Sequence, residues 1–142
     1  MQAMKCSVSR CPAAASRRPS VIGRAAVGGP VATRQLLLHS GETTIAVPIS
    51  PEKVKELQGA IQNLFVTFAE KAKATRPKRH EMMEWTTNDE RVSVEVFCNP
   101  NAHTTAFDAK LLITVASEGG LKVTTEARLS AITSDVDDFM KS

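Results

Sequence analysis

The clearest pattern of apolar and polar positions runs through residues 51–75 and has the spacing of an amphipathic helix. Apolar side chains recur there at steps of three and four residues, which places them on one face of a helix. This face consists of Val54, Leu57, Ile61, Leu64, Phe65, Phe68 and Ala72. Ser50 and Pro51 are typical of a helix start, and Pro77 predicts that the helix ends near Thr75. We expect a long core helix that lies on a sheet.

Beyond residue 81 the period of the pattern changes to two, which is typical of antiparallel strands with one buried and one exposed face. Four such segments follow one another, separated by turn-forming residues: 83–85, 92–97, 107–115 and 121–127. The earlier segment Thr43–Ile49 also alternates, and Pro48 confines it to a sheet edge or a strand end. We therefore expect an antiparallel sheet of about four to five strands.

The end of the chain predicts a short closing helix. Ser134 is a candidate N-cap, three aspartates follow it in the expected first turn, and Val136, Phe139 and Met140 form the apolar side. The expected order is therefore β-α-β-β-β-β-α, an α+β domain in which the long helix packs on the antiparallel sheet.

Charge divides the chain into two unlike parts. The first 41 residues hold six Lys or Arg and no Asp or Glu, and the first carboxylate is Glu42. An Arg-rich, Ser-bearing segment without acids is typical of an organelle transit peptide. We expect residues 1–40 to be a disordered presequence that is cleaved between Val31 and Ser40, and residues 41–142 to form one domain. A retained basic tail is the alternative.

The composition of the presequence favours the chloroplast over the mitochondrion. Three prolines and three glycines before residue 31 would interrupt the long amphipathic helix that mitochondrial import signals use. Short Ala- and Arg-bearing stretches such as residues 13–18 are similar to plastid transit peptides. We expect the chloroplast stroma, with the mitochondrial matrix as the alternative.

Removal of the presequence changes the electrostatic picture of the protein. The whole chain has a net charge of +3, but residues 42–142 hold 12 basic and 15 acidic groups. A mildly acidic domain argues against a general binder of nucleic-acid backbones. Cys98 is the single cysteine of this part, which excludes an internal disulfide and favours a reducing compartment. No apolar run approaches the roughly 20 residues of a membrane span.

Catalytic and metal-binding patterns are weak. Cys98 and His103 flank a turn and resemble a nucleophile and a base, but no third orienting group or oxyanion site accompanies them. His80 and His103 with one cysteine fall short of the four ligands of a structural zinc. We expect no enzyme activity, no cofactor and no metal. A ligand carrier or small enzyme with a cavity between helix and sheet is a third hypothesis.

Two neighbouring segments are candidates for binding a partner. The run 71–80 is the one basic cluster of the expected domain and includes Lys78 and Arg79. It fits an acidic partner or RNA, and the simpler interpretation is a solvated helix end. Met82, Met83 and Trp85 follow it and are candidates for an apolar protein-binding patch. Ordinary core positions are the alternative for these three.

The presequence and the compact body, which ends in Glu118-Gly-Gly-Leu-Lys-Val-Thr-Thr-Glu-Ala-Arg-Leu-Ser, give the chain a resemblance to known proteins. It resembles the small nucleus-encoded auxiliary proteins of green plastids, including assembly factors of the chloroplast ATP synthase coupling factor. This resemblance implies a stromal factor that contacts a coupling-factor subunit during assembly. The sequence thus predicts a non-enzymatic protein-binding factor for a photosynthetic complex. The alternative is an RNA- or ribosome-associated plastid protein that uses residues 71–80.

Overall fold

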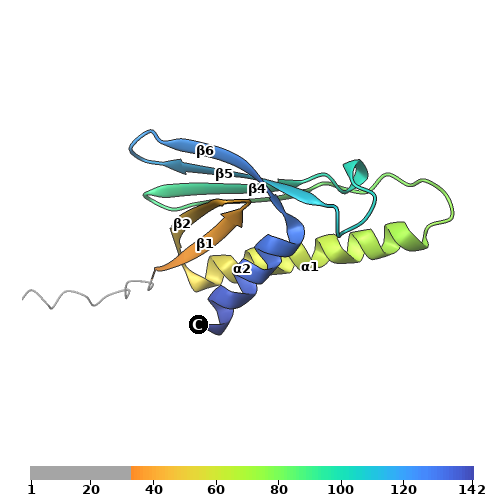
Figure 1. Ribbon diagram of the computed structural model, residues 1–142, viewed down its shortest axis with the longest axis horizontal. Coiled ribbons are helices and arrows are strands. Elements are labelled where there is room, and N and C mark those ends of the chain that lie inside the picture. The colour runs from red at the N-terminus through yellow and green to blue at the C-terminus, as the bar shows by residue number, and fades with distance from the viewer. Residues whose placement is uncertain (1–32) are drawn as a thin grey trace, which may run out of the picture. The chain divides into compact units, whose positions relative to one another are not determined.

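Residues 33–142, the part of the chain that this computed structural model describes, form six strands and two long helices (Figure 1). The strands are β1 (Arg34–Ser40), β2 (Thr43–Ile49), β3 (Met83–Asn88), β4 (Val92–Cys98), β5 (Lys110–Ser117) and β6 (Lys122–Arg128). The helices are α1 (Pro51–Lys73), α2 (Leu129–Lys141) and the short 3-10 helix η2 (Pro100–Ala102). The predicted α+β class, with a long helix beside antiparallel strands, is confirmed.

The strands form two antiparallel sheets rather than the single sheet that we expected. One sheet has the order β3-β4-β5-β6, and the other is the hairpin β1-β2. The strand Thr43–Ile49 therefore pairs with a preceding strand, with Leu36 opposite Val47 and Leu38 opposite Ile45. Gly41 has a φ of +63° in the turn between them, a conformation that favours glycine.

Strand β1 corrects the expected domain boundary at residue 40. Leu36 and Leu38 are each 2 % exposed and belong to the core, so residues 34–40 are not a disordered presequence. The guanidinium of Arg34 also lies 4.8 Å from the ring centroid of Phe139 and donates a hydrogen bond to Ser142. The folded part therefore begins no later than Arg34. The rest of the expected presequence, residues 1–32, lies outside the described residues, and its role as a transit peptide stays a prediction.

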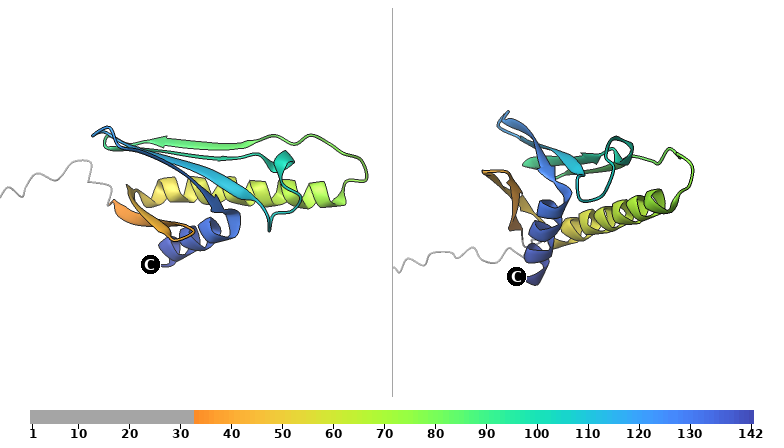
Figure 2. Two further views of the ribbon diagram at one scale, coloured as in Figure 1. Left: turned by 45° about the horizontal axis from the view of Figure 1, so that its top comes forward. Right: turned by 45° about the vertical axis from the view of Figure 1, so that its right-hand side comes forward.

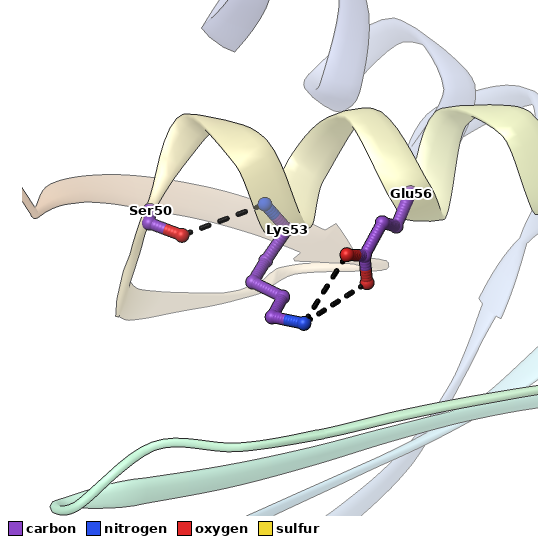
Figure 3. Close-up of polar contacts among 3 residues, drawn as sticks. All are labelled: Ser50, Lys53 and Glu56. Carbon is purple, nitrogen blue, oxygen red and sulfur yellow. Dashed lines mark hydrogen bonds and ion pairs between the residues drawn. The ribbon is translucent and has the colours of Figure 1, made fainter. Parts of the chain in front are cut away.

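Helix α1 begins and ends close to where the sequence predicts. The Ser50 hydroxyl accepts a hydrogen bond from the Lys53 amide at 3.4 Å, and Lys53 pairs with Glu56 one turn later (Figure 3). The buried face is the predicted one without its two marginal members: Val54, Leu57, Ile61, Leu64 and Phe68. Phe65 is partly exposed and Ala72 is exposed, because both lie at the border of the stripe.

Helix α2 begins five residues before the predicted start at Ser134. Leu129 and Ile132 continue the buried stripe of Val136 and Phe139 at steps of three and four residues, so the apolar period already starts at the end of β6. The aspartates that we placed in the first turn consequently lie in the middle and the last part of the helix.

The end of the hairpin β1-β2 is fixed to the four-stranded sheet and to α2. The hydroxyl of Ser40 lies 2.7 Å from that of Thr125 and donates to the carbonyl of Glu126 at 2.6 Å. Strand β1 and helix α1 also contact α2, and α1 contacts β3. Figure 2 shows both helices on the same side of the four-stranded sheet. The core lies between these layers, and the loop from α1 to β3 extends from one end of them.

Candidate functional site

A basic groove lies where α1 ends and the chain turns back toward the four-stranded sheet. It is lined by Lys71, residues 74–80 and Asn101 and has a volume of about 820 Å³. Among the residues that line it are four Lys or Arg and one His, but no Asp or Glu. We call this feature the basic groove.

The helix end and the following loop build one wall of the groove. Helix α1 ends at Lys73, and the amide of Ala74 donates to the carbonyls of Glu70 and Lys71. Pro77 cannot continue a helix, so the chain between Ala74 and Met83 crosses to β3 without regular structure. The predicted helix end before Pro77 is thereby confirmed.

The turn around η2 builds the opposite wall and fixes the loop. The amide side chain of Asn101 pairs with the main chain of His80 in both directions. The His80 amide donates to Oδ1 at 2.9 Å, and Nδ2 donates to the His80 carbonyl at 2.7 Å. Lys71 donates to the carbonyls of Pro100, at 2.9 Å, and His103. Lys71 thus stabilises the structure of the groove. Arg76, Lys78 and Arg79 remain available to contact a ligand.

Three cations of the groove have no acidic partner within residues 33–142. Arg76, Lys78 and Arg79 are exposed, and the ion pairs of the described chain lie elsewhere. The ring nitrogen Nε2 of His80, on the groove wall, is buried and lacks a hydrogen-bond partner within the same range. Like charges held close together raise the potential of the groove, which favours an anionic ligand.

The predicted apolar patch of Met82, Met83 and Trp85 does not form. Met83 and Trp85 are only 9 % and 8 % exposed, because they share the inner face of β3 with Thr87 and point toward the core. Met82 precedes the strand and is 50 % exposed, at the end of the loop that lines the groove. The structure therefore brings Lys78 and Arg79 together and removes two of the three apolar candidates.

The surroundings of Cys98 do not favour an ionised thiol. The thiol of Cys98 is 1 % exposed, and burial raises its pKa from the ordinary value of 9.0 to about 11. The thiol is therefore protonated near neutral pH. The Nε2 atom of His103 accepts a hydrogen bond from the Lys110 amide at 3.4 Å, which is a structural role in the turn before β5. Within residues 33–142 no cluster of three His, Cys, Asp or Glu side chains is arranged to hold a metal.

The aspartates of α2 hold the fold together. Asp135 accepts hydrogen bonds from His39, and Asp137 accepts one from the side-chain amide of Gln58 at 3.0 Å. Each bond joins α2 to a different element, which explains two of the three carboxylates without a metal. Sequence reasoning missed His39, because the strand that carries it was assigned to the presequence.

Two of the outer apolar residues also differ from expectation. Phe107 is 77 % exposed, because β5 begins only at Lys110 and the predicted strand started three residues too early. Leu121 lies in the turn before β6 and is exposed as well. Phe97 is half-buried and Leu112 is partly exposed on the outer face of the sheet, as the alternation predicts.

Comparison of the chain with protein-family models and with curated proteins finds no match. Within residues 33–142, neither helix combines the length and the apolar composition of a membrane span. The functional argument therefore depends on the geometry and charge of the basic groove.

Proposed function

We propose that this protein is a non-enzymatic binding factor that docks an acidic segment of a partner protein in the basic groove. The observation that carries the proposal is the set of Arg76, Lys78 and Arg79, which are exposed and lack acidic partners within residues 33–142. An isolated surface ion pair contributes at most about 1 kcal/mol, so several convergent cations are needed for a useful interaction.

A fixed groove suits protein binding because the loop does not have to be ordered on contact. Asn101 and Lys71 already hold the loop and the η2 turn in place. Preorganised loops lose less conformational entropy on binding than free ones. The partially exposed Met82 at the end of the loop adds an adaptable apolar contact beside the cations.

The proposed setting is the chloroplast stroma, where the factor would assist the assembly of a photosynthetic complex such as the ATP synthase coupling factor. The acid-free composition of the first 33 residues and the resemblance to plastid auxiliary proteins support this setting. The described residues hold 13 Lys or Arg and 15 Asp or Glu, so the domain itself is slightly acidic and its positive charge is concentrated locally.

RNA is the competing ligand for a groove of this charge. The lining of the groove contains no Phe, Trp or Tyr, so it lacks the stacking surface on which single-stranded RNA binding usually depends. The net negative charge of residues 33–142 also weakens long-range attraction of a polyanion.

The test is affinity purification from chloroplast stroma with three forms of the protein that begins at residue 33. These are the unchanged form, the variant Lys78→Glu/Arg79→Glu, and the matched variant Lys55→Glu/Lys122→Glu, which changes the same charge outside the groove. We expect the unchanged and matched forms to retain one acidic protein after nuclease treatment, and the groove variant to lose it. Enrichment of ribosomes or RNA alone would refute the proposal.

A further inference from the structure

Strand β3 has an open edge next to the basic groove. It stands at the end of the order β3-β4-β5-β6 and pairs only with β4 among the described strands. Every second residue of an edge strand directs its amide and carbonyl away from the sheet. Such an edge is able to pair with an extended segment from another protein.

The other ends of the two sheets are less suited to pairing. Strand β2 forms the open edge of the hairpin and contains Pro48, which has no amide hydrogen to donate. Strand β6 is flanked by β1, whose Ser40 hydroxyl bonds to Thr125 and to the carbonyl of Glu126. Strand β3 contains no proline, and no such contact covers its outer edge within residues 33–142.

The basic loop leads directly into this edge. Arg79 precedes Met83 by four residues, a distance of at most about 13 Å along an extended chain. The main-chain amides of Arg76, Lys78 and Arg79 make no hydrogen bond within the described part of the chain. A single extended segment of about ten residues is therefore long enough to reach both β3 and the cations.

We infer that the acidic segment of the partner binds in extended form, as an added strand on the open edge of β3, with its carboxylates at Lys78 and Arg79. This inference rests on the proposed function of the groove. Glu84 is exposed on β3 and repels an acidic residue placed opposite it. The segment therefore carries neutral β-branched residues along β3 and its acids next to the loop. The basic loop lies at the N-terminal end of β3. In the more stable antiparallel pairing, the C-terminal half of the added segment lies at that end, so this half carries the acids.

The experiment uses a synthetic peptide of about ten residues with a Val/Thr half followed by an Asp/Glu half. Two further peptides of the same sequence carry N-methyl groups on alternate amides of the Val/Thr half. One peptide is methylated at the odd-numbered positions and the other at the even-numbered positions, and we call these two sets of amides the two phases. In an added strand, only one of the two sets of amides points toward β3 and donates hydrogen bonds to it. We expect methylation of that phase to weaken binding about tenfold or more, and methylation of the other phase to leave it unchanged. Alternate amides of residues 83–88 should exchange hydrogen more slowly in the complex.

The outcomes separate this inference from the function on which it depends. Equal binding of both methylated peptides, with binding lost in Lys78→Glu/Arg79→Glu, would overturn strand addition and leave the groove as a docking site. Equal weakening of both methylated peptides would overturn it too, because an edge strand distinguishes the phases. If none of the three peptides binds and an oligoribonucleotide does, both the inference and the proposed function are wrong.

Discussion

His39 on β1 and Asp135 on α2 are 96 residues apart in the chain, and one carboxylate joins them by two hydrogen bonds. The His39 amide donates to Oδ2 and the ring Nδ1 lies against Oδ1, each at 2.7 Å. The side chain of Asp135 is only 9 % exposed. Because an ionised carboxylate only accepts hydrogen bonds, Nδ1 carries the hydrogen here. The pair fixes β1 to α2.

Replacement of Asp135 by Ala should lower the free energy of unfolding by about 2 kcal/mol, because it leaves the His39 amide and imidazole without their acceptor. Asp138→Ala is the matched control, since Asp138 is exposed and its change should stay within about 0.5 kcal/mol. Urea denaturation of both variants measures the difference. Equal losses would show that the contact between His39 and Asp135 does not stabilise the fold.

Truncation tests where the folded part begins. A protein that starts at residue 33 should keep its stability, whereas one that starts at residue 41 lacks β1 and loses Leu36 and Leu38 from the core. Each of these buried leucines contributes about 2–5 kcal/mol, so the shorter protein should fail to fold cooperatively. Thermal unfolding followed by circular dichroism distinguishes the two. Cooperative unfolding of the shorter form would contradict the assignment of β1 to the core.

The two faces of α1 should respond differently to truncation of a side chain. Leu57 is fully buried, so Leu57→Ala should cost about 2–5 kcal/mol. Val66 is 57 % exposed on the same helix, and Val66→Ala should change stability by less than about 0.5 kcal/mol. Chemical denaturation provides both numbers. A larger effect at Val66 would indicate that this face is covered in solution.

Cys98 should make stability fall in alkaline solution. Its pKa is raised by burial to about 11 in the folded protein, against an ordinary value of 9.0. The folded state therefore keeps a proton that the unfolded state releases, so this stabilisation is complete below pH 9 and is lost as the pH rises toward 11. The loss is at most about 1.4 kcal/mol per pH unit.

Cys98→Ala removes this contribution and serves as the reference. The chain contains no tyrosine, so the lysines form the main alkaline background in both proteins. Denaturation at several pH values between about 8 and 11 gives the slope of the free energy of unfolding against pH for the unchanged protein and for Cys98→Ala. Identical slopes would mean that the thiol titrates at its ordinary pKa and is exposed.

Asn101 should protect the basic loop from proteolysis. Without its side chain the main chain of His80 loses its two-way pairing, and the loop opens more often. Trypsin should then cleave after Lys78 and Arg79 several times faster in Asn101→Ala than in the unchanged protein. Asn63→Ala, on the exposed face of α1, is the matched control and should leave the rate unchanged. Unchanged cleavage in Asn101→Ala would show that other contacts hold the loop.

The sequence was most informative where one period extended over many residues. The helix stripe from Val54 to Phe68 and the inward alternation at Val94 and Val96 correspond to observed core positions. Long stripes are reliable because many side chains must agree on one face. The class of the fold follows from these two patterns alone.

The errors arose where local signals competed. Leu36, Leu37 and Leu38 form a continuous apolar run, which hides the alternation of β1. The sequence around this run contains no Asp or Glu before Glu42, which favours a presequence. Ser134 and the aspartates resembled a helix start, although the apolar stripe had already begun at Leu129. Both errors concern boundaries, which local composition determines poorly.

The candidate site was predictable in its charges and not in its shape. Lys78 and Arg79 were visible as a basic run, but the pairing of Asn101 with His80 joins positions 21 residues apart. Trp85 is a candidate for either a surface patch or the core in the sequence, because the pair Met82-Met83 leaves the register of this segment open; in the structure it lies on the buried face of β3. Contacts across turns have no signature in a single sequence.

The contacts between β1 and α2 have a consequence for biosynthesis. Strand β1 is synthesised before α2, but its contacts need residues of that helix and the residue after it. His39 binds Asp135, and Arg34 contacts Phe139 and Ser142. Contacts between residues that are far apart in the sequence are associated with slow folding. The contacts between β1 and α2 therefore form only after residues 135–142 have been synthesised.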